Sequence, residues 1–238
     1  RDGDEWVING QKIYITNGSI ADVVVLTAKT DPEKGTRGIS AFIVEKGTPG
    51  FKAGRDEKKM GLKGSVTSEL FFEDCRIPAE NLLGTEDQGF KQFLVTLDAG
   101  RVAIAAMAVG LAQAAYERSL DYAKTREQFG RPIAKFQAIR WMLADMATQI
   151  DAARLMVHRA AWLKEQEMNY TKEAAMAKLL ATEMAERVCH DAIQIHGGYG
   201  YVREYEVERM YRDQRLCQIG EGTNEIQRLI ISREVLQG

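Results

Sequence analysis

The chain is poor in the residues that build disulfides and metal sites. Its 238 residues include three cysteines, which are widely spaced and form no CxxC pattern. This favours reduced thiols in a reducing compartment over a disulfide framework. The three histidines show neither an HExxH motif nor a paired spacing. These patterns argue against a zinc site, and we expect no metal.

The chain also lacks an excess of charge of one sign and a long apolar run. Its net charge is −2, which does not favour a protein that binds the phosphate backbone of a nucleic acid. No uninterrupted apolar run approaches the ~18 residues of a membrane span. We therefore expect neither a nucleic-acid partner nor a membrane span. With 45% hydrophobic residues, the chain can bury a sizeable core.

The first third of the chain is rich in short β-prone runs separated by turn residues. Strands are expected at residues 6–8, 11–16, 23–27, 39–44 and 69–72. The Asn9-Gly10 pair between the first two suits a two-residue type I′ hairpin. Because no helical segment separates these strands, they predict an antiparallel sheet or barrel-like domain and not βαβ units.

Beyond residue 88 the apolar period becomes helical. Apolar residues recur every three or four positions in stripes at residues 90–115, 139–160, 181–195 and 226–230. Thr171 is expected to cap the third helix. The alanines and methionines of the stripes are interpreted as the core of a helical bundle. The sequence thus predicts an α+β chain with a β domain at residues 1–87 and a helical domain at residues 88–238.

The segment at residues 219–227 presents a carboxylate between two glycines, directly before an apolar helix-forming run. Glycine on each side of Glu221 lets the backbone turn sharply and lets a flat ligand approach. Thr223 is expected to be the N-cap of the following helix, where Glu225 would complement the helix dipole. These residues alone also fit an ordinary surface turn with a solvated glutamate.

Seven segments together decide between these readings, because they resemble the acyl-CoA dehydrogenase family in the family's order. They lie at residues 12–18, 59–63, 71–78, 97–101, 126–132, 194–201 and 219–227. The resemblance is to short- and medium-chain members of the butyryl-CoA dehydrogenase kind. It implies an antiparallel β domain, present in part, followed by an up-down helical bundle. It also implies FAD-dependent conversion of an acyl-CoA thioester to the trans-2-enoyl-CoA.

Desaturating a thioester requires a base at the α-carbon and a redox cofactor that accepts the β-hydride. The resemblance assigns the base to Glu221, which we expect in an apolar pocket that excludes water. It places Gly222 along the thioester, whose carbonyl the Glu221 N–H would polarise. Asp98 and Arg101 match positions that contact the CoA moiety. They are also spaced as an intrahelical i,i+3 pair, and the two readings are compatible.

Two glycines bear on the substrate. Some branched-chain and long-chain members of the family carry their base at the position of Gly100, which cannot serve as one here. This supports Glu221 and favours a short or medium straight chain. Many members have tyrosine at the position of Gly220, so the glycine opens space beside the thioester and weakens any chain-length assignment.

The FAD contacts implied by the resemblance come from three parts of the chain. In the β domain, the strand that carries Tyr14, Ile15 and Thr16 would lie against the flavin, and the threonine hydroxyl could donate to flavin N5. A second group would contact the FAD of a neighbouring subunit. Its members are Arg126, Gln128, Phe129, Phe136 and Gln137 at the pyrophosphate and adenine, and Gln194, Gly197 and Gly198 at the adenosine end. Near Glu221 they are Thr223 and Glu225. The glycine-rich run at 197–200 opens no βαβ unit, which excludes a Rossmann interpretation.

Shared FAD sites imply a homo-oligomer, expected to be a tetramer built as a dimer of dimers, with an electron-transfer flavoprotein as electron acceptor. Three alternatives remain: an acyl-CoA oxidase, a DNA-associated alkylation-response flavoprotein, and a non-catalytic helical module. The net charge and the intact Glu221 argue against the last two. The expected compartment is the bacterial cytoplasm or the mitochondrial matrix, between which the sequence does not decide.

Family members also carry a helical N-terminal domain and further strands ahead of the stretch matching residues 4–6. We therefore expect the 238 residues alone to bind FAD weakly and to turn over little.

Overall fold

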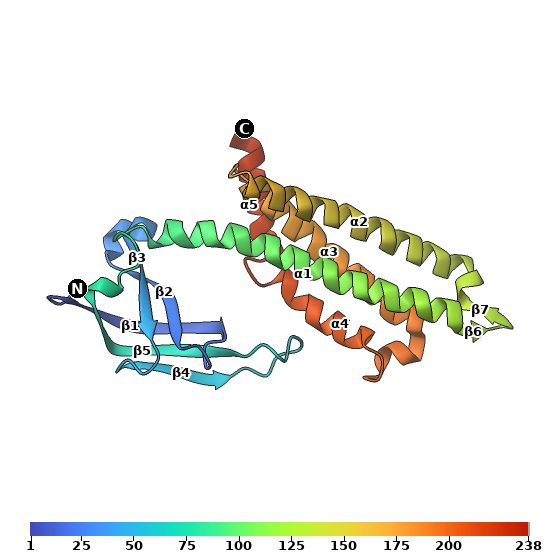
Figure 1. Ribbon diagram of the computed structural model, residues 1–238, viewed down its shortest axis with the longest axis horizontal. Helices are drawn as coiled ribbons and strands as arrows, with labels where there is room; N and C mark the ends of the chain where they lie inside the picture. The colour runs from blue at the N-terminus through green and yellow to red at the C-terminus, as the bar shows by residue number, and fades with distance from the viewer. Residues whose placement is uncertain (238) are drawn as a thin grey trace. The chain divides into compact units, whose positions relative to one another are not determined.

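The computed structural model describes residues 1–237 (Figure 1). Backbone contacts divide the chain into two units, Arg1–Thr96 and Leu97–Gly238. The first unit contains five strands, and the long helix α1 (Gly89–Thr125) begins shortly after the last of them. The predicted α+β class, with an antiparallel sheet followed by a helical bundle, is confirmed.

The β unit contains two antiparallel sheets. The first has the strand order β1-β5-β4, and the second pairs β2 with β3. The strands are β1 (Glu5–Thr16), β2 (Val23–Lys29), β3 (Ile39–Glu45), β4 (Phe51–Asp56) and β5 (Thr67–Pro78), with short 3-10 helices η1 (Pro32–Gly38) and η2 (Ala79–Asn81). The sequence did not predict β4, whose one large apolar residue is Phe51. Side chains from both sheets share one buried cluster that includes Trp6, Phe42 and Phe72.

The expected hairpin at Asn9-Gly10 is wrong, because β1 runs through both residues. Ile8 pairs with Cys75 and Gly10 with Phe72, so one residue of β1 faces two of β5. This is a β-bulge. The Asn9 side chain stabilises it by accepting from the Asp74 N–H at 2.8 Å and donating to the Asp74 carboxylate at 3.0 Å. The turn-forming pair therefore shifts the strand's register and does not end the strand.

A second bulge lies near the end of β1. Lys12 pairs with Leu70 and Ile15 with Ser68, which leaves two residues of β1 opposite one of β5. Tyr14 occupies the bulge with a left-handed φ of +57°, and the residue is 69% exposed. Bulges of this kind redirect a side chain out of the regular alternation of a strand.

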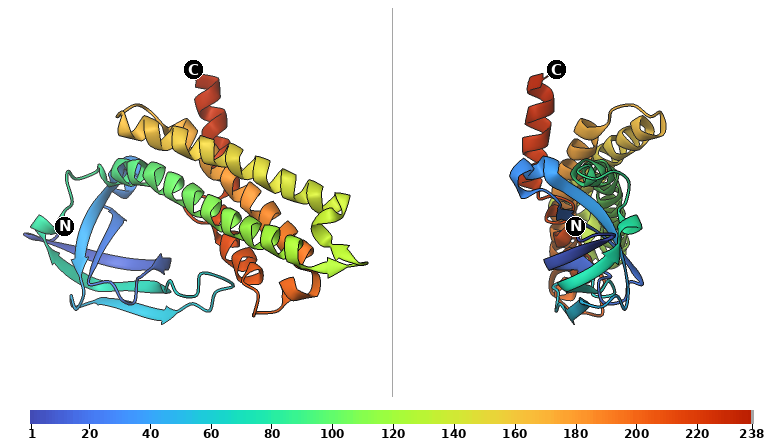
Figure 2. Two further views of the ribbon diagram at one scale, coloured as in Figure 1. Left: turned by 45° about the vertical axis from the view of Figure 1, so that its right-hand side comes forward. Right: turned by 90° about the vertical axis from the view of Figure 1, so that its left-hand side faces the viewer.

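The helical unit contains the C-terminal part of α1 and four further helices. They are α2 (Gln137–Glu165), α3 (Thr171–His196), α4 (Val207–Gln214) and α5 (Asn224–Gln237), connected by a small hairpin, β6 (Glu127–Gln128) with β7 (Arg131–Pro132), and by η3 (Ile133–Lys135), η4 (Gly197–Tyr201) and η5 (Arg215–Gln218). Figures 1 and 2 show α1, α2 and α3 running alternately up and down. Helix α3 is central, since it contacts α2, α4 and α5.

Alanines fill the centre of the bundle, as predicted. Those of α1, α2 and α3 that are fully buried are Ala105, Ala108, Ala112, Ala115, Ala123, Ala153, Ala160, Ala174, Ala175, Ala177, Ala181, Ala185 and Ala192. Side chains this small let helices approach closely, and Met146, Ile150 and Met184 fill the remaining space. Helix α4, which is short and strongly charged, was not predicted.

The first turns of α1 depart from the predicted core stripe. Phe90, Phe93 and Leu94 are 39%, 37% and 42% exposed. Within residues 1–237, α1 is also the one helix long and apolar enough to cross a membrane, with a mean hydropathy of 1.7. Core helices of helical bundles meet the same criterion, and Ala105, Ala108 and Ala112 of α1 lie in the bundle core.

Candidate active site

Glu221 lies in a tight turn between η5 and α5. Both Glu221 and Gly222 have left-handed backbones, with φ of +55° and +88°. Glycine adopts this conformation freely, whereas a glutamate is strained in it and must be held by its surroundings. A side chain at position 222 would also meet the Gln227 Nε2 atom at 2.9 Å. The backbone therefore requires glycine at position 222, whereas Glu221 is held in a strained conformation.

The Glu221 carboxylate lies against α1. A Cβ atom at Gly100 would stand 2.6 Å from Glu221 Oε2 and 3.1 Å from its Cδ. The missing side chain at Gly100 is therefore the space that the carboxylate fills. In the described residues Glu221 is exposed, so this part of the chain does not by itself enclose the carboxylate in the apolar pocket expected from the sequence.

Buried polar side chains bind the backbone of this turn. The Gly222 carbonyl accepts hydrogen bonds from Lys178 Nζ at 2.8 Å and from Gln227 Nε2 at 2.9 Å. Lys178 is fully buried, and burial lowers its pKa to about 8, although Glu221 and Glu225 oppose that shift. Sequence analysis did not single out Lys178, yet a lysine on the alanine-rich core face of α3 was a visible break in the apolar pattern.

Thr223 and Glu225 lie at the start of α5. Thr223 Oγ1 accepts from the Ile226 N–H at 3.5 Å, and the helix begins at Asn224. This agrees with the predicted N-cap. Hydrogen bonds from its own backbone N–H and from Thr223 lower the pKa of Glu225. The glutamate therefore stays ionised at the helix N-terminus, where its charge is favourable.

Asp98 and Arg101 form an ion pair one turn apart on α1, and Arg101 is only 5% exposed. Thr171 donates from its hydroxyl to the other Asp98 oxygen at 2.8 Å. Thr171 is therefore not the predicted cap of α3, whose N-cap is Tyr170 without a side-chain bond. The buried Arg101 Nε has no partner among residues 1–237. Buried polar atoms are usually hydrogen-bonded, so this donor is an exception in the described residues.

A second candidate site is a cavity of about 460 Å³ near the C-terminal end of α1. It brings together four predicted residues from two distant motifs, Arg126 and Gln128 with Gly197 and Gly198. Gly197 has a φ of +59°, and neither glycine would bring a Cβ within 4 Å of another group. The turn after α3 therefore offers open, side-chain-free backbone beside a cation.

Aromatic rings surround this cavity. Tyr122 stacks on His196 with centroids 4.3 Å apart, and the Arg126 guanidinium lies over the Tyr199 ring at 5.4 Å. Burial lowers the pKa of His196, whose Nδ1 is 2.7 Å from the Ala192 carbonyl. A neutral imidazole, two phenols and one guanidinium suit a ligand with a planar ring and a nearby negative charge. Of these residues only Arg126 was predicted.

Other predicted ligand residues lie outside the lining of this cavity. Gln194 and Gln137 are exposed, and Phe129 is 92% exposed with its ring edge against Phe136. In the β unit, Ile15 and Thr16 follow Tyr14 at the end of β1. That unit also contains a cavity of about 600 Å³, and no predicted ligand residue lines it.

Residues 1–237 contain no group of three or more His, Cys, Asp or Glu side chains able to hold a metal ion. All three cysteines are buried free thiols, and burial raises the pKa of Cys189 to about 12 and that of Cys217 to about 11. Thiols with such high pKa values are poor nucleophiles. Glu221 therefore stays the candidate catalytic residue predicted from the sequence.

Comparison with known families and structures gives a consistent result. The family description "acyl-CoA dehydrogenase, middle domain" matches residues 1–75, and "acyl-CoA dehydrogenase, C-terminal domain" matches residues 87–236. A probable acyl-CoA dehydrogenase of Bacillus subtilis, YngJ, is 59% identical over 99% of this chain and 62% of its own.

Two solved structures share the fold. Butyryl-CoA dehydrogenase from Megasphaera elsdenii superposes with a TM-score of 0.97 at 49% identity, over 99% of this chain and 62% of its own. A chain in a structure described as the electron transferring flavoprotein of Acidaminococcus fermentans has a TM-score of 0.98 at 52% identity, over 100% of this chain and 63% of its own. The present chain thus spans under two thirds of the length of these relatives. It belongs to the acyl-CoA dehydrogenase family.

Proposed function

We propose that this chain forms the part of an FAD-dependent acyl-CoA dehydrogenase that carries the catalytic base. The reaction converts an acyl-CoA thioester to the trans-2-enoyl-CoA, and Glu221 removes the α-proton. The observation that carries this proposal is the placement of the Glu221 carboxylate, which projects from a strained turn into the space above Gly100. Strained backbone at such a position is typical of functional sites.

Acyl-CoA dehydrogenases are FAD flavoproteins, and the residues of the second cavity suit this cofactor. Arg126 is placed to bind a pyrophosphate, and the open backbone at Gly197 and Gly198 lets a nucleotide approach closely. We propose that Phe129, Phe136, Gln137 and Gln194 contact the same nucleotide at its edges, and that Tyr14, Ile15 and Thr16 lie against the flavin. When bound, FAD supplies the acceptor for the hydrogen that leaves the substrate β-carbon with its electron pair.

The chain's own residues supply the proton chemistry and the substrate contacts. As the α-proton moves to a Glu221 oxygen, negative charge develops on the thioester carbonyl, and the Glu221 N–H donates to it. Gly222 lies along the thioester, and its lack of a side chain leaves room for it. Arg101, paired with Asp98, contacts the CoA moiety. Thr223 and Glu225 lie at the flavin side of the turn.

We propose an electron-transfer flavoprotein as the electron acceptor, in line with the Acidaminococcus relative, and a homotetramer that shares FAD sites between subunits. An oxidase of the same architecture would pass electrons to oxygen instead. Parallel turnover assays with the flavoprotein and with oxygen separate the two. Rapid peroxide formation by the wild-type holoenzyme would assign the protein to the oxidases.

The decisive test is Glu221→Gln in the full natural chain loaded with FAD. The variant keeps its flavin, because the substitution preserves shape and leaves the second cavity intact. Anaerobic bleaching of the flavin by butyryl-CoA should slow by at least about 10³-fold, because no general base remains. Glu117→Gln, at an exposed glutamate of α1, should retain its rate. Near-normal bleaching in Glu221→Gln would disprove the assignment.

A further inference from the structure

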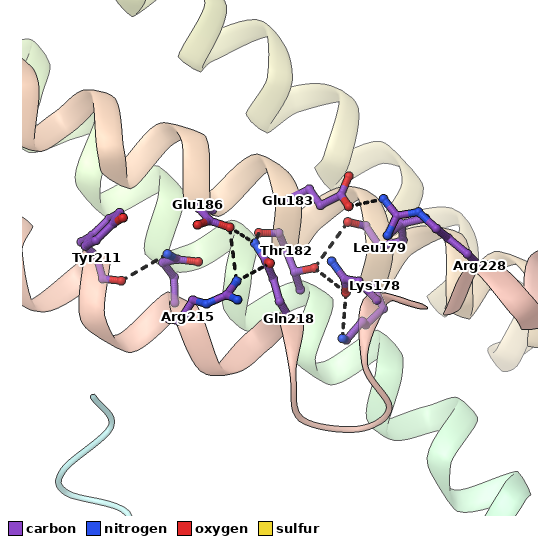
Figure 3. Close-up of polar contacts among 11 residues, drawn as sticks. Lys178, Leu179, Thr182, Glu183, Glu186, Tyr211, Arg215, Gln218 and Arg228 are labelled. Atoms are coloured by element: carbon purple, nitrogen blue, oxygen red, sulfur yellow. Dashed lines mark hydrogen bonds and ion pairs between the residues drawn. The ribbon is translucent and has the colours of Figure 1, made fainter. Parts of the chain in front are cut away.

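Helix α3 carries a polar stripe on a face that is otherwise filled by alanine. Lys178, Thr182 and Glu186 follow one another at four-residue steps and point toward the segment that carries Gln218 (Figure 3). Lys178 and Thr182 are fully buried. Polar groups in such positions are costly unless they are hydrogen-bonded, so their partners show what the stripe does.

The stripe holds the segment on both sides of the Glu221 turn. Before the turn, Gln218 Nε2 donates to the Thr182 carbonyl at 3.3 Å and to the Glu186 carboxylate. After the turn, Asn224 Oδ1 accepts from Lys178 Nζ at 2.9 Å and from Thr182 Oγ1 at 3.1 Å. The five residues 219–223 therefore run between two anchor points on one rigid helix.

Lys178 also reaches the turn itself, through the Gly222 carbonyl. We propose that Lys178 is a positioning residue, which fixes the backbone of the Glu221–Gly222 turn and thereby aims the Glu221 carboxylate over Gly100. The inference rests on the proposed role of Glu221 as the base.

Satisfying hydrogen bonds does not by itself require this lysine. Without Lys178, the Gly222 carbonyl still accepts from Gln227, and the Asn224 amide oxygen still accepts from Thr182. No acceptor would be left unpaired, so an apolar side chain of the same length would not cost the penalty of a buried orphan. Both partners of Lys178 in residues 1–237 are neutral oxygen atoms, so a buried ammonium gains no ion pair in return for its desolvation. The lysine therefore adds a further constraint on the geometry of the turn, beside the bonds from Gln227 and Thr182.

The test is Lys178→Met in the full natural chain loaded with FAD, because methionine keeps the length and loses the donors. The maximal rate of flavin bleaching by butyryl-CoA should fall roughly 100-fold, as expected for a misplaced reacting group. The substrate concentration at half-maximal rate should change less than about threefold, since the lysine makes no contact with the substrate side of the turn. FAD content should be unchanged.

A substrate deuterated at the α-carbon separates positioning from a structural defect. If Lys178 aims the base, proton abstraction becomes more limiting in the variant, and the isotope effect on bleaching should rise. A structural role alone would lower the melting temperature and leave the rate per bound FAD and the isotope effect at wild-type values. That outcome would overturn the inference. Lys164→Met, an exposed lysine of α2, is the matched control.

Two further variants keep the test decisive. Should Lys178→Met fail to fold, Lys178→Gln is the second variant, because its shorter amide cannot reproduce both hydrogen bonds of the ammonium, and a rate equal to that of Lys164→Met there would overturn the inference. Glu221→Gln distinguishes the two levels of the argument. If Glu221→Gln loses bleaching while Lys178→Met matches the Lys164→Met control, the positioning role is wrong and the base assignment stands. If Glu221→Gln keeps its rate, the base assignment itself is wrong.

Discussion

The helical unit contains two candidate sites that are built in opposite ways. Around Glu221 a strained turn is held by buried polar side chains of α3 and α5, and the Glu221 carboxylate is already directed over Gly100. Around Arg126, by contrast, exposed glycines and aromatic rings border an open cavity with few polar contacts of its own. The first site is organised in advance by the chain, as chemistry requires. The second offers a surface whose order depends on a ligand.

This contrast separates binding from chemistry, and among the variants that test it we expect the largest effect on FAD binding. Arg126→Gln removes the cation beside the open turn, where charge-assisted hydrogen bonds to phosphate are worth about 1.5–3 kcal/mol. The dissociation constant for FAD should therefore rise roughly 10- to 100-fold, as measured by titration of the apoenzyme. With FAD saturating, the rate of bleaching by butyryl-CoA should stay close to wild type.

The control is Arg118→Gln, on the same helix, whose guanidinium pairs with Glu206 on the surface. It should leave FAD affinity unchanged. If Arg126→Gln binds FAD normally, or loses its bleaching rate at saturating FAD, the division between the two sites does not hold.

Gly100→Ala addresses the other site. The new methyl group would overlap the Glu221 carboxylate, whose flexible end can move away at little cost in stability. Alanine is also the better helix former by up to about 1 kcal/mol. We expect the bleaching rate to fall roughly tenfold, because the base is displaced, while the melting temperature holds or rises and FAD affinity is unchanged.

Gly110→Ala is the matched control, since it lies in the same helix and no group lies within 4 Å of its added Cβ. It should gain the same helix stability and keep the full rate. Equal rates in the two alanine variants would show that Gly100 is not the space the working carboxylate needs.

The sequence predicted the scaffold well, because periodicity reports burial directly. The helical stripes of α2 and α3 lie in the core as expected, and the glycine-flanked Glu221 lies in a turn that requires glycine at position 222. Where local chemistry competes with tertiary pairing, sequence reasoning failed. Asn9-Gly10 favours a hairpin locally, but the pairing of β1 with β5 turns it into a bulge.

The polar groups that hold Glu221 were harder to predict. Lys178 and Gln227 lie 43 and 6 residues away from Glu221 along the chain, and their roles depend on a packing of α3 and α5 that periodicity does not specify. Thr171 shows the same limit, because its hydroxyl donates to Asp98 on another helix in place of capping its own. Apolar patterns thus predict which faces are buried, whereas the choice of polar partner is settled only by the assembled fold.

The smallest expected effect concerns how stability depends on pH, and it tests whether the organised site carries a cost. Burial lowers the pKa of Lys178 from its usual 10.5 to about 8, which corresponds to roughly 3 kcal/mol. Between these two pH values the unfolded chain binds more protons than the folded chain, so the lysine's destabilising effect is fully present at pH 7 and fades as the pH rises. Lys178→Met lacks this effect. Its melting temperature, relative to wild type, should therefore fall by several degrees between pH 7 and pH 10.5.

The groups that face the ammonium, namely Arg101, Cys217, Glu221 and Glu225, are present in both proteins, so the difference isolates the lysine. If the melting temperatures of the two proteins followed the same dependence on pH, the charged Lys178 would not destabilise the fold. Holding the Glu221 turn in advance would then carry no cost in stability.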